Sequence, residues 1–111
     1  MSKTRELTHA DVKKMISSYM NEEHVALCER AYHFAEVAHS GQVRKSGEPY
    51  IIHPIQVAGI LAELRMDPET VCAGYMHDIV EDTGATLDDI KEIFGPTIAM
   101  IVDGDTKIGK I

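Results

Sequence analysis

The chain has 111 residues, of which 44% are hydrophobic, and its formal net charge is −7. This length is typical of one domain with a hydrophobic core. The excess of acidic residues argues against a general nucleic-acid surface, and the lack of a long apolar run predicts no membrane-spanning helix. The polar start predicts no secretory signal. Cys28 and Cys72 are predicted to be buried free thiols, which suits a reducing cytoplasm.

The first part of the chain predicts two helices. Thr8, with Asp11 three residues later, predicts the start of a helix whose apolar positions continue to residue 19. Asn21 predicts the start of a second helix, which runs to residue 39 or 40 and stops at Gly41.

Three histidines are spread along the second helix: His24, His33 and His39. A lone histidine on a helix is more often structural or exposed to solvent than part of a site. His39 borders the next loop, and it is therefore the strongest site candidate of the three.

Residues 41–50 are predicted to form a loop, because two glycines and a proline interrupt the helical period. Arg44, Lys45 and Ser46 place two cations beside a hydroxyl in an acidic protein. One interpretation is a contact with an anion or nucleotide, in which the Arg44 guanidinium stacks on a base or binds phosphate. The other interpretation is a solvated basic turn, and the residue types alone leave both open.

The rest of the chain also predicts helices. One begins at residues 53–54, and the next opens at Pro68 behind the cap residue Asp67. A further helix over residues 87–94 follows the cap residue Thr86.

The last apolar segment begins at Pro96, and we expect it to end at Asp103 and Gly104. Asp103 and Asp105 are interpreted as turn residues, and residues 106–111 do not complete an element. No stretch predicts a strand, so the expected fold class is an all-α bundle.

The most informative stretch is residues 75–83, in the helix that Pro68 opens. Wound as a continuous helix, it separates an apolar packing face from a polar face. The polar face carries four groups that can bind metal or move protons: His77, Asp78, Glu81 and Asp82. The stretch therefore predicts a chemical site on one side of a helix that packs with its other side.

This polar face has no compensating positive charge. A solvated helix face normally carries Lys or Arg among its acids, but residues 68–90 contain neither. Gly74 adds no side chain to the polar side, and we interpret it as leaving room for a ligand. The face therefore predicts a bound cation.

His53 lies just before a predicted helix, where a histidine is usually a cap or core residue. His77 and Asp78 change this interpretation, because neutral imidazoles and a carboxylate are a normal divalent-metal set. Hard oxygen ligands with imidazoles fit Mn²⁺ better than a structural zinc, for which thiolates are expected. Glu81 lies one turn from His77, and Asp82 lies one turn from Asp78. A carboxylate at that distance can accept a proton from water activated by the ion.

These motifs together resemble the N-terminal hydrolase domain of the RelA/SpoT family of bifunctional guanosine tetraphosphate synthetase/hydrolases. The resemblance covers roughly residues 26–111, in motif order and with consistent gaps. The matching segments are residues 38–42, 44–50, 53–54, 77–83 and 102–107. The resemblance implies an HD-domain helical bundle, with residues 1–22 as a leading helix and residues 23–111 as the HD core.

The resemblance also implies Mn²⁺-dependent hydrolysis of the 3′-pyrophosphate of guanosine tetra- or pentaphosphate, which gives GDP or GTP and pyrophosphate. The metal ligands that it implies are His53, His77 and Asp78. Glu81 and Asp82 match the family's acidic pair, which positions and activates the attacking water. The residues implied to contact the guanine nucleotide are Arg44, Lys45 and Ser46.

Two features of the family are missing from these 111 residues. The family's metal site takes a fourth ligand, an aspartate from a later helix, and the family also carries a synthetase domain. We therefore expect an HD core that lacks its later helices at the C-terminal end. The chain is expected to be a fragment of a longer cytoplasmic enzyme of the stringent response, with a synthetase domain and regulatory domains. Alone, it is expected to bind metal weakly and to hydrolyse poorly.

Two other functions stay open at this point. One is an HD phosphohydrolase that acts on another nucleotide. The other is a catalytically silent module that binds a guanine nucleotide or a protein partner without any dependence on metal. No direct binding to nucleic acid or to a membrane is expected.

Overall fold

The computed structural model describes residues 6–43 and 45–109, with side chains as far as residue 104 in the last helix. Within these residues the chain forms seven helices and no strand beyond an isolated bridge between Val43 and Pro49. The helices are α1 (His9–Ser17), α2 (Glu22–Ala38), α3 (Ile52–Glu63), α4 (Pro68–Met76), α5 (Ile79–Asp82), α6 (Leu87–Phe94) and α7 (Pro96–Gly109). The predicted all-α class is confirmed.

Side-chain caps begin four of these helices where the sequence predicted them. The cap residues, each of which accepts a hydrogen bond from a backbone N–H three residues later, are Thr8, Asn21, Asp67 and Thr86. Such a cap satisfies a backbone donor that has no partner inside the helix. Gly95, with φ of +99°, ends α6 in a backbone region that favours glycine.

The prediction for the last segment was wrong. We expected it to end at Asp103 and Gly104, but α7 continues to Gly109. A Cβ placed on Gly104 would meet no atom within 4 Å, so this glycine costs only its helix propensity, about 1 kcal/mol. The burial of the apolar side of α7, which includes the fully buried Val102, is sufficient to offset that cost. Asp103 and Asp105 therefore lie within a helix and not in a turn.

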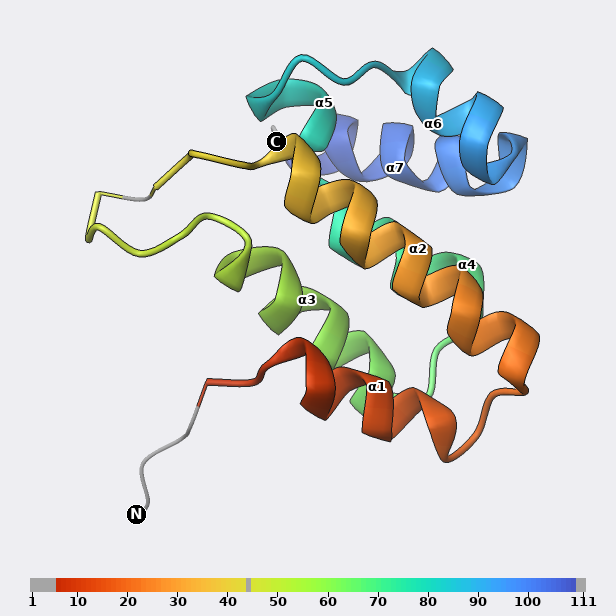
Figure 1. The fold of residues 1–111 in the computed structure, drawn as a ribbon. Coiled ribbons are helices and arrows are strands. Elements are labelled where there is room, and N and C mark those ends of the chain that lie inside the picture. The colour runs from red at the N-terminus through yellow and green to blue at the C-terminus, as the bar shows by residue number, and fades with distance from the viewer. Residues whose placement is uncertain (1–5, 44, 110–111) are drawn as a thin grey trace.

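Helix α4 is the centre of the bundle. It packs against α2, α3 and α7, whereas α1 packs on α2 and α3, and α6 packs on α7. Figure 1 shows α1 and the α6–α7 pair on opposite sides of α4. The buried residues of α4 are Val71, Cys72, Ala73, Gly74, Tyr75 and Met76. Because the whole C-terminal part of α4 is buried, the position of the chain that follows it is fixed by packing.

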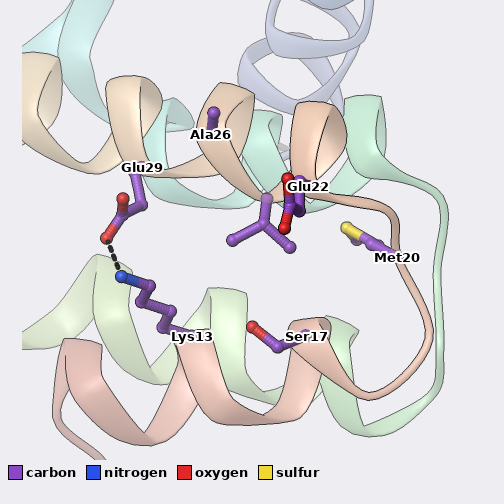
Figure 2. A pocket seen from close by; sticks show the side chains of 7 residues that line it. Lys13, Ser17, Met20, Glu22, Ala26 and Glu29 are labelled. Atoms are coloured by element: carbon purple, nitrogen blue, oxygen red, sulfur yellow. Dashed lines mark ion pairs between the residues drawn. The ribbon is translucent and has the colours of Figure 1, made fainter.

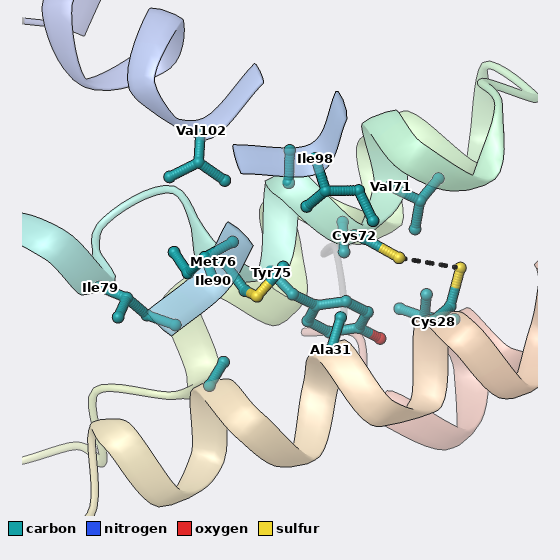
Figure 3. Close-up of a cluster of buried hydrophobic side chains, with 14 of the residues drawn as sticks. Cys28, Ala31, Val71, Cys72, Tyr75, Met76, Ile79, Ile90, Ile98 and Val102 are labelled. Carbon is teal, nitrogen blue, oxygen red and sulfur yellow. Dashed lines mark hydrogen bonds between the residues drawn. The ribbon is translucent and has the colours of Figure 1, made fainter. Parts of the chain in front are cut away.

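Cys28 on α2 and Cys72 on α4 face each other in this core, as Figure 3 shows. Their Sγ atoms are 3.8 Å apart, and both are buried free thiols. The contact with Cys28 and then burial raise the pKa of the Cys72 thiol, so it keeps its proton. The prediction of buried free thiols is confirmed, although nothing in the sequence indicates that the two sulfurs lie together.

Helices α3 and α4 approach each other closely at Gly74. A Cβ on this residue would lie 2.6 Å from Cδ1 of Leu61 and 3.5 Å from Cα of Ala58, both on α3. Gly74 is itself buried, so the missing side chain serves helix packing. The interpretation of Gly74 as room for a ligand was therefore wrong.

This close approach predicts opposite effects for two glycine substitutions. Each Gly→Ala change gains up to about 1 kcal/mol of helix propensity, but Gly74→Ala also forces Leu61 to move, and overpacking costs about 1–3 kcal/mol. We expect Gly104→Ala to raise the free energy of unfolding and Gly74→Ala to lower it. Urea unfolding followed by circular dichroism measures both. An equal gain in the two variants would show that the α3–α4 contact does not constrain residue 74.

Helix α1 is attached through a cluster around His9. The His9 ring stacks on Tyr32 with centroids 3.8 Å apart, and its Nδ1 lies 2.7 Å from the hydroxyl oxygen of Tyr75. Its Nε2 is 3.6 Å from a carboxylate oxygen of Glu29, which also pairs with Lys13 at 3.1 Å. Burial lowers the pKa of His9 below the ordinary value of 6.5, although Glu29 acts in the opposite direction.

The lowered pKa of His9 predicts a loss of stability in acid. The unfolded chain binds a proton at residue 9 more readily than the folded chain, so the contribution of His9 is present above pH 6.5 and is lost as the pH falls through the lower folded value. We expect the free energy of unfolding to fall less steeply below pH 6.5 in His9→Gln than in the unmodified chain. The exposed His24, changed to Gln, is the control, and equal slopes in all three proteins would contradict the prediction.

Candidate metal centre

The pair His77 and Asp78 forms the turn between α4 and α5. The prediction of one helix through residues 75–83, with this pair well inside it, was wrong. The carbonyl of Gly74 accepts a hydrogen bond from Nδ1 of His77 at 2.8 Å, whereas in a continuous helix it would accept the backbone N–H of Asp78. The chain turns here, and both side chains of the pair can face the start of α3.

His53, from the first turn of α3, meets this pair. Nε2 of His77 lies 3.2 Å from Oδ2 of Asp78, and Nε2 of His53 lies 3.6 Å from the same oxygen. Within the part of the chain that the structure describes, these three residues are the one group of His, Cys, Asp or Glu spaced to hold a metal ion, with ligand atoms within 4.8 Å of one another. Their side chains are 36%, 21% and 23% exposed for His53, His77 and Asp78, so an ion can enter from solvent.

The hydrogen bonds of this group favour a cation. Because the Gly74 carbonyl can only accept, Nδ1 of His77 carries the hydrogen, and a neutral ring then presents the lone pair of Nε2 to Asp78. If that ring is instead protonated on both nitrogens, it donates to Asp78, and this contact is the main cause that lowers the pKa of Asp78; the charge of His53 adds to it, while burial opposes both. Two acceptors at 3.2 Å are stable only with a proton or a metal ion between them.

The predicted acidic pair, Glu81 and Asp82, lies on α5, and both residues are exposed. The backbone N–H of Asp82 donates to the carbonyl of Asp78 at 2.9 Å, so one helical turn still separates the two aspartates. The hydroxyl of Tyr50 lies 2.7 Å from Oδ2 of Asp82 and 3.4 Å from Oδ2 of Asp78. Burial and these two carboxylates raise the pKa of Tyr50 above its usual range, so the hydroxyl keeps its proton and donates.

The predicted nucleotide loop lies beside the same tyrosine. Lys45 and Ser46 line a cavity of about 530 Å³ together with Val43 and Tyr50. Arg44 lies outside the described residues. The volume is within the range of small-ligand sites, roughly 300–1,000 Å³. Because Tyr50 both lines this cavity and contacts Asp82, the cavity and the acidic pair share a residue.

Sequence reasoning missed the residues that connect these parts. Tyr50 stacks on His39 with ring centroids 4.6 Å apart, and His39 is only 2% exposed. Nδ1 of His39 lies 2.8 Å from Oε1 of Gln42, whose amide nitrogen donates to the backbone carbonyl of Asp82. His39 was the favoured histidine of α2, but Tyr50 and Gln42 received no role. Their one sequence signal is that they are polar side chains at the two ends of the basic loop.

A second cavity, of about 290 Å³, lies between α1 and α2, as Figure 2 shows. Its lining residues are Lys13, Ser17, Met20, Glu22, Val25, Ala26 and Glu29. None of them was predicted to belong to a site, and the Lys13–Glu29 ion pair already neutralises one acid at its edge. Separately, none of the helices described here has the length and apolar character that crossing a membrane requires.

Comparison with known proteins identifies the family of this chain. The sequence pattern of the HD domain family matches residues 31–111. Over 112 aligned residues the chain is 51% identical to guanosine-3′,5′-bis(diphosphate) 3′-pyrophosphohydrolase of Aquifex aeolicus, with 100% of this chain and 16% of that protein covered. It is 44% identical over 100 residues to the bifunctional (p)ppGpp synthase/hydrolase SpoT of Escherichia coli strain K12, with 90% and 14% covered.

A third relative is a GTP pyrophosphokinase of Streptomyces coelicolor, which is 55% identical over 83 residues, with 75% of this chain and 10% of that protein covered. The chain therefore spans less than a fifth of the length of each of these three relatives. Both the motif order read from the sequence and the matched residues point to one family. The chain belongs to the RelA/SpoT family and carries its HD domain.

Proposed function

We propose that this chain is part of a hydrolase that removes the 3′-pyrophosphate of guanosine tetra- or pentaphosphate and releases GDP or GTP and pyrophosphate. The observation that carries this function is the group of His53, His77 and Asp78, in which the first turn of α3 and the turn after α4 meet around one carboxylate oxygen. The relative from Aquifex aeolicus, which is 51% identical over the length of this chain, bears the name of that activity. The site chemistry and the relationship thus support the same reaction.

His53, His77 and Asp78 are the proposed metal ligands, and Mn²⁺ is the proposed ion. Two imidazoles and a carboxylate suit a divalent ion that prefers nitrogen and oxygen, and the described residues near this group offer no thiolate that would favour zinc. When bound, such an ion polarises a phosphoryl oxygen and lowers the pKa of a water molecule. The carbonyl of Gly74 holds the His77 ring in the orientation that this binding needs.

Glu81 and Asp82 are the proposed residues that orient the attacking water and accept its proton. Hydrolysis adds this water at the phosphorus bonded to the ribose 3′ oxygen, and the bond between that phosphorus and the 3′ oxygen breaks. A carboxylate one helical turn from a metal ligand suits this role, and Asp82 is held in that relation to Asp78. The residues proposed to contact the guanine nucleotide are Arg44, Lys45 and Ser46, of which the last two line the adjoining cavity.

We further propose that residues 23–111 act as an HD core preceded by a leading helix at residues 1–22, within a longer cytoplasmic enzyme of the stringent response. The lengths of the relatives support this, since the chain spans 16% of the Aquifex aeolicus protein and 14% of the bifunctional Escherichia coli enzyme. A synthetase domain and regulatory domains would then lie in other parts of the same polypeptide. A later helix would supply a fourth metal ligand.

The activity can be measured in a chimera in which these 111 residues replace the aligned segment of the Aquifex aeolicus relative. We expect release of pyrophosphate from guanosine tetraphosphate with Mn²⁺. His77→Ala and Asp78→Ala should each lower kcat/KM by at least about 100-fold, because metal stabilisation of the transition state is worth several kcal/mol.

His24→Ala is the matched control, because His24 is exposed on α2 and should leave turnover unchanged. An inactive chimera that still binds the nucleotide without metal would contradict the hydrolase and favour a silent binding module. A chimera that hydrolyses another nucleotide faster would instead identify a different HD phosphohydrolase substrate.

Removal of metal provides an independent check on the ligands. Treatment with EDTA should abolish turnover, and added Mn²⁺ should restore it more fully than Mg²⁺ or Zn²⁺, because the site combines imidazole with oxygen ligands. His53→Ala should raise the concentration of Mn²⁺ required for half-maximal activity by at least about tenfold. Full restoration by Zn²⁺ alone would overturn the choice of ion and leave the site in place.

A further inference from the structure

We propose that Tyr50, held in place by His39 and Gln42, is a positioning residue that fixes Asp82 for the hydrolytic step. This inference rests on the proposed hydrolase function and adds a component to it. The three residues come from the end of α2 and the two ends of the basic loop, and together they contact Asp82 at its side chain and at its backbone.

The hydroxyl of Tyr50 has one hydrogen to donate, and the distances select its acceptor. Oδ2 of Asp82 lies 2.7 Å away, which is the usual length of an O–H···O hydrogen bond, whereas Oδ2 of Asp78 lies 3.4 Å away. The hydrogen is therefore directed to the side chain of the proposed base. Tyr50 restrains Asp82 strongly and the proposed metal ligand Asp78 only weakly.

The ring of Tyr50 is itself held in a fixed orientation. It lies against the His39 ring with an angle of 18° between the planes, and His39 is almost completely buried at the end of α2. The ring centroid of Tyr50 also lies 6.3 Å from that of His53, nearly perpendicular to it. The hydroxyl thus stands on a ring bounded on one side by a buried residue and on another by a proposed metal ligand.

Gln42 adds a second contact to the same aspartate. Its Oε1 can only accept, so Nδ1 of His39 donates to it, and this assignment directs the amide N–H₂ toward the backbone carbonyl of Asp82. The backbone of the loop is closed in the same place, because the N–H of Tyr50 donates to the carbonyl of Gln42 at 3.1 Å. One buried histidine therefore supports both contacts to Asp82.

Such support is needed because α5 has only four residues. A helix of one turn has little stability of its own, and an exposed carboxylate on it would otherwise sample several rotamers. Asp82 is exposed, and both donors are uncharged. Tyr50 orients the carboxylate and Gln42 holds the backbone carbonyl of the same residue, so neither contact pairs the charge of Asp82. The arrangement restricts the geometry of the proposed base and leaves its charge available.

The test compares Tyr50→Phe with Tyr32→Phe in the chimera defined above. Tyr32 also stacks on a histidine and donates to a carboxylate, on Glu36, but it lies in the cluster around His9. We expect Tyr50→Phe to lower kcat by about 10- to 100-fold, as for other groups that orient a catalytic side chain, with KM and Mn²⁺ affinity changed by less than about threefold. Tyr32→Phe should leave all three quantities unchanged.

A double-mutant cycle with Asp82→Asn then separates positioning from a general loss of structure. If Tyr50 acts through Asp82, Tyr50→Phe should cause little further loss in the Asp82→Asn background. Gln42→Glu keeps an acceptor for His39 but loses the donor to the Asp82 carbonyl, so it should lower kcat with the same unchanged KM. Thermal unfolding of each variant shows whether the protein remains folded.

Three results would overturn this inference while the unmodified chimera is active. The first is an unchanged kcat in both Tyr50→Phe and Gln42→Glu. The second is a loss of activity that weaker Mn²⁺ binding fully explains. The third is a loss of kcat in Tyr50→Phe that is as large in the Asp82→Asn background as in the unmodified chimera. An unmodified chimera without hydrolytic activity would instead contradict the proposed function. The two failures are therefore distinguished by the activity of the unmodified protein.

Discussion

The close packing of α3 against α4 is the constraint on which the site depends. The two helices are joined by only residues 64–67, so they run as antiparallel neighbours, and the first turn of α3 lies at the same end as the last turn of α4. His53 and His77 meet for this reason, although 24 positions separate them in the sequence. The small residues Ala58 and Gly74 allow the approach, and buried apolar side chains around α4 maintain it.

The break between α4 and α5 has an equally direct effect on the chemistry. In a continuous helix, adjacent side chains diverge by about 100°, which directs His77 and Asp78 apart. The turn brings Nε2 of His77 to 3.2 Å from the carboxylate of Asp78, with His53 on the same oxygen. The turn also separates the proposed metal ligands from the proposed acidic pair, and the two sets are held differently. The proposed ligands lie at the ends of packed helices, whereas the proposed acids are exposed side chains on a helix of only four residues.

Local signals in the sequence predicted most of the fold. The caps Thr8, Asn21, Asp67 and Thr86 act within three residues, so their effect can be read without knowing what lies nearby. The errors arose where distant contacts decide the outcome. The glycine at position 104 resembles a helix stop, but burial along α7 overrides it. Gly74 resembled an open position because its neighbour across the interface, Leu61, cannot be inferred from helical periodicity.

The candidate site likewise contains residues that could be predicted from the sequence and residues that could not. The close approach of the proposed metal ligands was predictable because His53, His77 and Asp78 are chemically conspicuous and the helices that carry or precede them are adjacent in the chain. Tyr50 and Gln42 were not, since an isolated tyrosine or glutamine in a loop has no periodic pattern and its partner is 32 or 40 positions away.

These neutral residues nevertheless have a definite physical role. A cation placed beside Asp82 would pair with the carboxylate. The Tyr50 phenol instead holds the carboxylate, and the Gln42 amide holds the backbone carbonyl, by hydrogen bonds alone. In this protein the groups that are easiest to recognise provide the charge, and uncharged neighbours from a separate loop provide the geometry. That loop also lines the cavity beside the site. A ligand in the cavity would therefore contact the same short segment of chain that orients Asp82 through Tyr50.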